Sequence, residues 1–179
     1  METKLPSTQS MEDAIKHIIS KYDDPEREGL IETPKRYIKA LDELLTAEPP
    51  KIKMFSGEGY NQMIIESGIQ YYTFCEHHLL PFFGEVKIGY VPDKYIIGLS
   101  KLSRIVNYFS KRLNTQERLT ENICRYLWEQ MKPQGIGVIV NGRHLCKEMR
   151  GAKAKGLMRT TALRGIFYEE EVKIEFLKS

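Results

Sequence analysis

Two short clusters of thiol and imidazole side chains, far apart in the sequence, constrain how this chain can fold. Cys75 and His78 stand three positions apart in "TFCEHHLLPFFG", and His144 and Cys146 stand two apart in "RHLCKEM". His78 and Cys146 are 68 positions apart, so only the tertiary fold can join the clusters. Two thiolates and one imidazole are ligands that zinc accepts, and three protein ligands leave a fourth position for water, as in catalytic sites.

The same residues permit other interpretations. His144 could be a fourth ligand of a closed structural site, or the cysteines could simply be buried. In the three-ligand arrangement, His144 and His77 would be extra imidazoles suited to proton transfer near neutral pH. A cytidine-deaminase-like site is not expected, because the P-C-x-x-C half of its signature is missing. Cys124 lies on the apolar face of a predicted helix, so we expect it in the core.

The composition sets the class of protein around these clusters. The chain has 179 residues, 41% hydrophobic and 28% charged, which suits a globular domain with at most a small appendage. A net charge of +3 is too small to indicate nucleic-acid binding and is compatible with anionic small ligands. No apolar run is long enough for a membrane span, and the first residues contain no apolar signal core. We therefore expect a cytoplasmic protein that binds neither nucleic acid nor membrane. An odd number of cysteines, three, argues against a disulfide framework.

Hydrophobic periodicity predicts an α+β domain after a helical N-terminal region, with an antiparallel sheet and helices on one face. The predicted helices cover 11–22, 33–45, 100–113, 115–131 and 169–178, and the predicted strands cover 62–74, 82–91, 94–99, 135–140, 143–149 and 160–168. Asn141-Gly142 is a strong hairpin signal between two of these strands. In such a hairpin, His144 and Cys146 would point to the same face.

Basic residues at the start of one predicted helix form a candidate anion site. Ser100 is the expected N-cap, and Lys101 and Arg104 are neighbours on the helix surface, where the helix dipole favours an anion. Arg150 follows Cys146 by four positions. Glu117 lies in the first turn of the next helix, where an acidic residue is favoured by the dipole alone.

In combination, these motifs resemble the zinc-dependent GTP cyclohydrolase I family. The resemblance rests on "CEHHLLPFFG", "IGLSKLSRIV", "TQERLT", "HLCKEMRG" and "TTALRGIF", in that order, and covers the chain from about residue 11 onward. It implies a tunnelling fold, in which small antiparallel sheets join into barrels across subunits. Residues 1–50 would form the N-terminal helical region and residues 51–179 the catalytic domain. The assembly would be a homo-oligomer, typically a decamer of two facing pentamers, with active sites at subunit interfaces.

The resemblance also implies a role for each candidate residue. The implied ligands of one zinc ion per subunit are Cys75, His78 and Cys146, and the implied proton-transfer residues are His77 and His144. The implied triphosphate and sugar contacts are Ser100, Lys101, Arg104 and Arg150, with Arg36 and Lys39 as implied basic residues from a neighbouring subunit. The implied guanine contacts are Gln116 and Glu117. A carboxylate can accept from both N1–H and the exocyclic amino group, which selects guanine over adenine.

The implied reaction is hydrolytic opening of the GTP imidazole ring at C8, with release of formate. An Amadori rearrangement of the ribose then gives 7,8-dihydroneopterin triphosphate, a step in pterin and tetrahydrofolate biosynthesis. Two alternatives stay open: a relative that stops early or uses another purine nucleotide, and a non-catalytic protein with a structural zinc. His77, His144, Glu117 and Arg150 argue against the second alternative, because a structural site needs none of them.

Overall fold

The computed structural model describes residues 6–179, which divide into two compact units. The first unit ends at Thr46 and contains α1 (Thr8–Ser20) and α2 (Thr33–Leu45), which confirms the two predicted N-terminal helices. Pro34 lies in the first turn of α2, where its missing N–H breaks no helical hydrogen bond. The predicted boundary after residue 50 stays a prediction, and residues 1–5 of the predicted N-terminal region lie outside the described residues.

The second unit, Ala47–Ser179, is organised around a five-stranded sheet in the order β5-β2-β3-β6-β7. Its strands are β2 (Ile64–Cys75), β3 (Pro81–Val91), β5 (Leu113–Asn114), β6 (Gly135–His144) and β7 (Met158–Gly165). All neighbouring pairs are antiparallel except the short parallel pair of β5 with the end of β2. A separate two-stranded ribbon joins β1 (Met54–Ser56) to β4 (Tyr95–Ile97).

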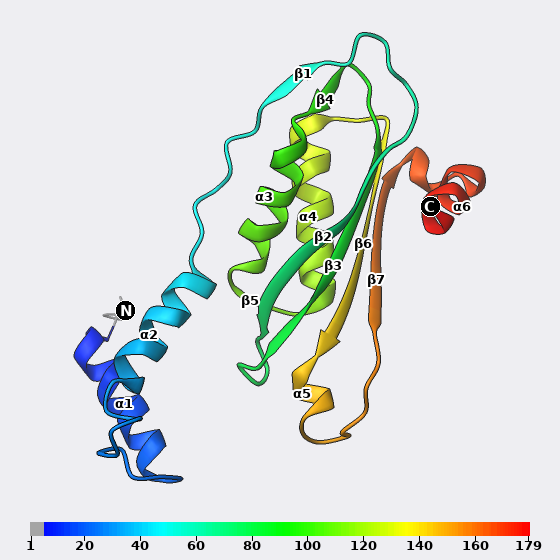
Figure 1. The fold of residues 1–179 in the computed structure, drawn as a ribbon. Coiled ribbons are helices and arrows are strands. Elements are labelled where there is room, and N and C mark those ends of the chain that lie inside the picture. Colours follow the sequence, from blue (N-terminus) through cyan, green and yellow to red (C-terminus); the bar gives the residue numbers. More distant parts are fainter. Residues whose placement is uncertain (1–5) are drawn as a thin grey trace, which may run out of the picture. The chain divides into compact units, whose positions relative to one another are not determined.

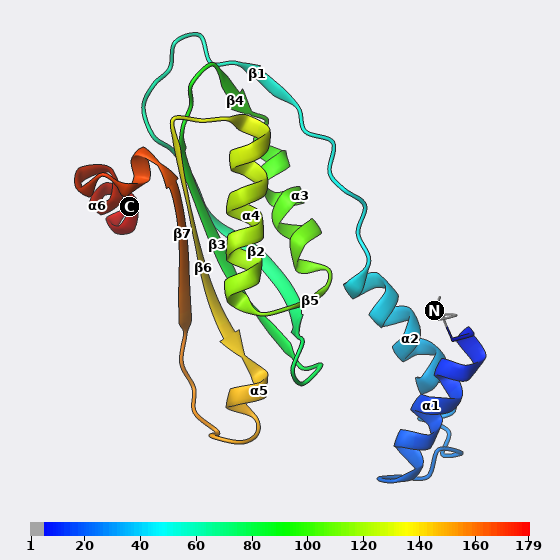
Figure 2. The ribbon, with the colours of Figure 1, turned by 180° about the vertical axis from the view of Figure 1, so that it is seen from behind.

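Two helices cover one face of this sheet, α3 (Leu99–Ser110) against β2 and α4 (Gln116–Met131) against β6 and β7 (Figure 1). Apolar residues recur at helical spacing on the inner face of each helix, and Ile105 and Ile123 are fully buried. The view from behind shows both helices on the same side of the sheet (Figure 2). The predicted α+β architecture is confirmed.

The C-terminal helix packs on the opposite face of the sheet from α3 and α4. It follows a short 3₁₀ turn, η1 (Ile166–Tyr168), and spans α6 (Glu170–Lys178). The Phe176 ring lies over Gly89 and Gly137, where a Cβ atom would come within 2.7 Å and 2.5 Å of it. Lys87 on β3 donates to the Phe176 and Ser179 carbonyl oxygens at 2.7 and 2.8 Å. The two glycines therefore make room for the helix, and one lysine caps its last turn.

The predicted hairpin at Asn141-Gly142 is wrong. β6 runs through both residues and pairs with β3 on one edge and with β7 on the other, so the chain cannot reverse there. A Cβ atom at Gly142 would lie 2.3 Å from the Gln116 side-chain oxygen and 2.5 Å from the Tyr71 hydroxyl. This glycine therefore permits a close approach of side chains from other elements rather than a turn.

Two further local predictions are wrong. The strand predicted over 143–149 is wrong beyond His144, because β6 ends there and the chain enters the short helix α5 (Leu145–Glu148). His144 and Cys146 therefore do not share a strand face. The helix predicted from Ser100 begins one residue earlier, with Gly98 as its N-cap, and Ser100 lies exposed in the first turn. Thr115 is the N-cap of α4, since its side chain accepts from the Arg118 N–H.

Candidate metal centre and active site

The turn between β2 and β3 holds the first two metal-ligand candidates. Cys75 ends β2, and its carbonyl accepts the N–H groups of His78 and Leu79 at 3.3 and 2.9 Å. Leu79 has a φ of 52°, a left-handed conformation that is rare for a bulky residue and closes the turn tightly. The Cys75 sulfur consequently lies 3.7 Å from Nδ1 of His78.

The end of β6 brings the third candidate to this turn. The register of β3 with β6 sets Phe82 opposite His144, and α5 follows directly with Cys146. The ligand atoms of Cys75, His78 and Cys146 all lie within 4.8 Å of one another. Two sulfurs and one imidazole nitrogen suit zinc, whose ligand bonds are roughly 2.0–2.3 Å long, so this donor set fits a single ion. Among the described residues the group has three ligands, and the alternative with His144 as a fourth is not formed.

The surroundings of the Cys146 thiol shift its pKa. Burial, followed by the neighbouring Cys75 thiol, raises the pKa of the Cys146 thiol, whereas nearby Arg150 lowers it. Negative charge on the neighbouring Cys75 sulfur would repel a Cys146 thiolate and so disfavours ionisation of Cys146. A bound metal ion removes that repulsion and takes both as thiolates.

His144 lies beside the metal group but is held by other contacts. Its ring stacks on Phe82, with centroids 4.4 Å apart and an interplanar angle of 7°. Its Nε2 atom lies 2.9 Å from the Gln116 side-chain oxygen. Burial lowers the pKa of His144, and the nearby Glu117 carboxylate acts in the opposite direction. His144 and Cys146 together line a cavity of about 440 Å³ that also includes Lys147.

Gln116 and Glu117, the two residues predicted to contact guanine, face different surroundings. The Gln116 side chain is only 1% exposed. Its nitrogen lies 3.0 and 2.9 Å from the Val140 and Met158 carbonyl oxygens. The amide of Gln116 is thus enclosed and paired at both ends, whereas Glu117 is exposed in the first turn of α4.

His77 and Glu76 occupy the outer side of the β2–β3 turn. His77 has a side chain 64% exposed, with Nδ1 3.8 Å from the Cys75 sulfur and Nε2 3.9 Å from the Glu76 carboxylate. Glu76 also pairs with Arg118 on α4 at 2.6 Å. Glu76 therefore ties the turn to the helix that carries Glu117.

The basic residues at the start of α3 lie far from the metal group within one chain. Lys101 and Arg104 line a separate cavity of about 480 Å³ together with Lys51 and Lys111. Ser103, between them, contacts Glu66 near the start of β2, and Cys75 ends that strand nine residues later. At about 3.3 Å per residue, Glu66 and Cys75 are roughly 25–30 Å apart. The structure therefore does not bring Lys101 and Arg104 to the metal group of the same chain.

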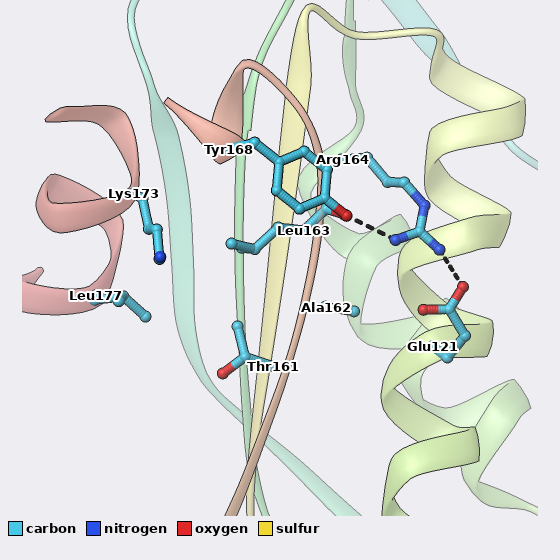
Figure 3. A pocket seen from close by; sticks show the side chains of 8 residues that line it. All are labelled: Glu121, Thr161, Ala162, Leu163, Arg164, Tyr168, Lys173 and Leu177. Carbon is cyan, nitrogen blue, oxygen red and sulfur yellow. Dashed lines mark hydrogen bonds and ion pairs between the residues drawn. The ribbon is translucent and has the colours of Figure 1, made fainter. Parts of the chain in front are cut away.

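The other predicted contacts are divided between the two units. Arg150 follows α5, and its charge lowers the pKa of the Cys146 thiol, so it lies near the candidate metal group in the second unit. Arg36 and Lys39 are exposed on α2 of the first unit. A further cavity, of about 560 Å³, lies beside β7, where Arg164 contacts Glu121 and the Tyr168 hydroxyl (Figure 3). Its lining contains no thiol or imidazole, so it is distinct from the candidate site.

Asn114 supports the site although nothing in the sequence indicated it. This residue is fully buried in β5, opposite Cys75, and its carbonyl accepts the Glu76 N–H at 3.1 Å. Its amide nitrogen donates to the Thr73 hydroxyl and the Phe109 carbonyl at 3.0 and 2.9 Å. These partners come from β2 and α3, so only the folded chain reveals the role of Asn114 in holding the turn that carries Cys75 and His78.

The second unit is thus an α+β domain in which Cys75, His78 and Cys146 form a group that could hold a metal ion at one end of its sheet. The sequence profile described as GTP cyclohydrolase I matches residues 11–179. A GTP cyclohydrolase 1 of Aquifex aeolicus is 47% identical over 159 residues, 87% of this chain and 86% of the relative. A GTP cyclohydrolase 1 of Campylobacter jejuni is 42% identical over 170 residues, 91% of this chain and 90% of the relative. The chain belongs to the GTP cyclohydrolase I family, which has the tunnelling fold. No helix in the described part of the chain is long and apolar enough to cross a membrane.

The metal centre can be tested by removing one thiol. In Cys146→Ala we expect the affinity for zinc to fall by at least about 100-fold, because losing a direct ligand costs more than the roughly 10- to 100-fold typical of an outer partner. Metal content after loading and dialysis, measured by mass spectrometry, checks this. Cys124→Ala is the matched control, since Cys124 is buried between α4 and the sheet, outside the metal group. Equal zinc retention by wild type and Cys146→Ala would contradict the ligand assignment.

Proposed function

We propose that this chain is a GTP cyclohydrolase I that converts GTP to formate and 7,8-dihydroneopterin triphosphate with one zinc ion per subunit. The observation that carries the proposal is the meeting of Cys75, His78 and Cys146 beside His144, in a chain of this family. A purely structural metal site would need neither the stacked and hydrogen-bonded imidazole of His144 nor the exposed carboxylate of Glu117 beside it. A cytoplasmic location stays a prediction from the sequence.

Substrate selection is assigned to Glu117. Its carboxylate is exposed in the first turn of α4 and close enough to influence His144 electrostatically. Two carboxylate oxygens can accept the N1–H and exocyclic amino hydrogens of guanine, whereas adenine offers no N1–H. Guanine bound in this way would lie within the neighbourhood of His144 and the metal group.

Proton transfer is assigned to His144 and His77. Opening the imidazole ring at C8 requires a proton at N7, which makes C8 electrophilic, and water must add there. His144 is stacked and hydrogen-bonded, so it is suited to deliver a proton at a defined point, whereas exposed His77 can exchange protons with solvent. A zinc ion held by Cys75, His78 and Cys146 would act as a Lewis acid that activates water near neutral pH.

The triphosphate is assigned to the basic residues of a second copy of the chain. Lys101 and Arg104 line a cavity with Lys51, Lys111 and one acidic residue, Glu48, and the excess of positive charge suits several phosphates. Their separation from the metal group exceeds the distance from the purine ring to the terminal phosphate of one GTP. We therefore propose a homo-oligomer, a decamer by family resemblance, in which neighbouring chains complete each site.

The remaining assignments follow the same division. Arg150 would contact the substrate from the metal side, near Cys146. Ser100 would assist the sugar steps from the first turn of α3 of the neighbouring chain, next to Lys101. Arg36 and Lys39 would approach the phosphates from α2 of a neighbouring chain. Residues 1–50 would thus serve the catalytic domain, 51–179, of another copy.

The reaction itself is the first test. Incubation of the zinc-loaded protein with GTP should release one formate per GTP and, after oxidation, give fluorescent neopterin. Chromatography with fluorescence detection and an enzymatic formate assay measure the two products. No formate from a zinc-replete oligomer would refute the proposal, and formate without neopterin would show a reaction that stops after ring opening.

Guanine selection is tested by Glu117→Gln. The amide can no longer accept two hydrogens, and a lost hydrogen bond to a charged group costs about 1.5–3 kcal/mol, so KM for GTP should rise roughly 10- to 100-fold with zinc content unchanged. Glu121→Gln, one turn further along α4 and paired with Arg164, is the matched control and should leave KM unchanged. An unaltered KM in Glu117→Gln would remove Glu117 from the guanine site.

Sharing of the site between chains is tested by complementation. Cys146→Ala and the double variant Lys101→Ala/Arg104→Ala should each be inactive alone. In randomly mixed oligomers about a quarter of the sites would combine an intact metal half with an intact basic half, so activity should return toward that fraction. Copurification of two different tags verifies mixing, and mixed oligomers that stay inactive would show that each site is built by one chain.

A further inference from the structure

We propose that Gln116 is a positioning residue that fixes the orientation of the His144 ring, so that Nε2 stays in a hydrogen bond to Gln116 and Nδ1 is the ring nitrogen left open to the substrate. The inference rests on the proposed function, because it concerns the proton-transfer residue of that site. It replaces the predicted role of Gln116 as a guanine contact.

The orientation of the Gln116 amide follows from its neighbours. The Val140 and Met158 carbonyl oxygens, on β6 and β7, lie 3.0 and 2.9 Å from the end assigned as nitrogen. Carbonyl oxygens only accept hydrogen bonds, so the group facing them must be the NH₂ group. The opposite orientation would place three oxygen atoms against one another. The amide oxygen therefore points toward His144.

The tautomer of His144 follows from that orientation. The Gln116 oxygen can only accept, and Nε2 of His144 lies 2.9 Å from it, so Nε2 must carry a hydrogen. In the neutral imidazole, the lone pair is then on Nδ1. The bond to Gln116 therefore occupies Nε2, and Nδ1 is the ring nitrogen that Gln116 leaves free.

The surrounding side chains prevent the ring and the amide from turning. Phe82 covers one face of the imidazole with nearly parallel rings. On the far side of the amide, the Thr160 hydroxyl lies 3.1 Å from the Gln116 nitrogen and 2.6 Å from the Thr120 hydroxyl. Gly142 leaves the space that the amide occupies, since a Cβ atom there would lie 2.3 Å from its oxygen.

This arrangement explains why a buried glutamine stands next to an exposed glutamate at the start of α4. A general acid must present the correct nitrogen within hydrogen-bond reach of the atom that it protonates. An imidazole free to flip would present Nε2 as often as Nδ1 and would lose that geometry. With the Gln116 side chain enclosed and paired, base recognition falls to Glu117, one residue further on.

The tautomer can be observed directly in the wild-type protein. The chain contains four histidines, so ¹⁵N-histidine labelling and solid-state NMR give few ring-nitrogen signals. The His144 pair is assigned by its loss in His144→Gln. We expect a protonated Nε2 and an unprotonated Nδ1 under conditions where the ring is neutral. A neutral ring that carries its proton on Nδ1 would overturn the proposal, whatever the activity of the protein.

Kinetics of Gln116→Leu provide the second test. Loss of an outer partner that orients a histidine typically costs roughly 10- to 100-fold in activity, so we expect kcat for formate release to fall by that factor. KM for GTP and zinc content should stay near wild type, because neither the guanine contact nor the metal ligands change. Gln134→Leu is the matched control, since its amide also donates to a carbonyl, that of Pro92, at the opposite end of β6. Its kcat should match wild type.

Each other result has a distinct meaning. A raised KM with unchanged kcat in Gln116→Leu would identify Gln116 as a substrate contact and overturn the proposal. A kcat equal to that of Gln134→Leu would overturn it as well. If wild type released no formate, the proposed function would fail, but the NMR result would still decide the tautomer. If Gln116→Leu did not fold, the wild-type spectrum alone would decide.

Discussion

The pairing of β6 with β3 is the constraint on which the rest of the candidate site depends. Its register sets Phe82 opposite His144, so β6 ends beside the turn that carries Cys75 and His78. The next residues form α5 and place Cys146 within reach of both. A shift of one residue would turn every side chain of β6 to the other face and separate the ligands. Because β6 is paired on both edges and largely buried, such a shift is strongly disfavoured.

The start of α4 links this metal centre to the proposed chemistry. Thr115 caps the helix, Gln116 turns inward to His144, and Glu117 turns outward. Arg118 then pairs with Glu76 on the metal-binding turn. Four consecutive residues thus cap the helix, contact the His144 imidazole, present an exposed carboxylate and bind the β2–β3 turn. Hydrogen bonds from Gln116 to β6 and β7 keep this segment in place. His144, the proposed acid, and Glu117, the proposed guanine contact, are therefore positioned by the same segment.

The distribution of charge supports the proposal that neighbouring chains complete each site. The thiol and imidazole groups gather at the end of β2, whereas the basic residues of α3 gather near its beginning. In GTP, the purine that would meet the metal group and the triphosphate that would meet the basic residues lie close together. Neighbouring chains can bring opposite ends of the domain together, which a single rigid sheet cannot do.

The sequence by itself determined the α+β class and the positions of the main helices and strands, because these depend on local periodicity. From residue chemistry it predicted a metal site at Cys75, His78 and Cys146, and the fold brings these three side chains together. It also indicated that Cys124 belongs to the core, where it is fully buried. It misplaced the hairpin at Asn141-Gly142, because a glycine that leaves room for Gln116 and Tyr71 has the same local signature as a turn. Only the tertiary structure decided which way Gln116 points, that Asn114 supports the turn, and that Lys101 and Arg104 lie apart from the metal group. Those features depend on contacts between residues distant in the chain, which no local pattern encodes.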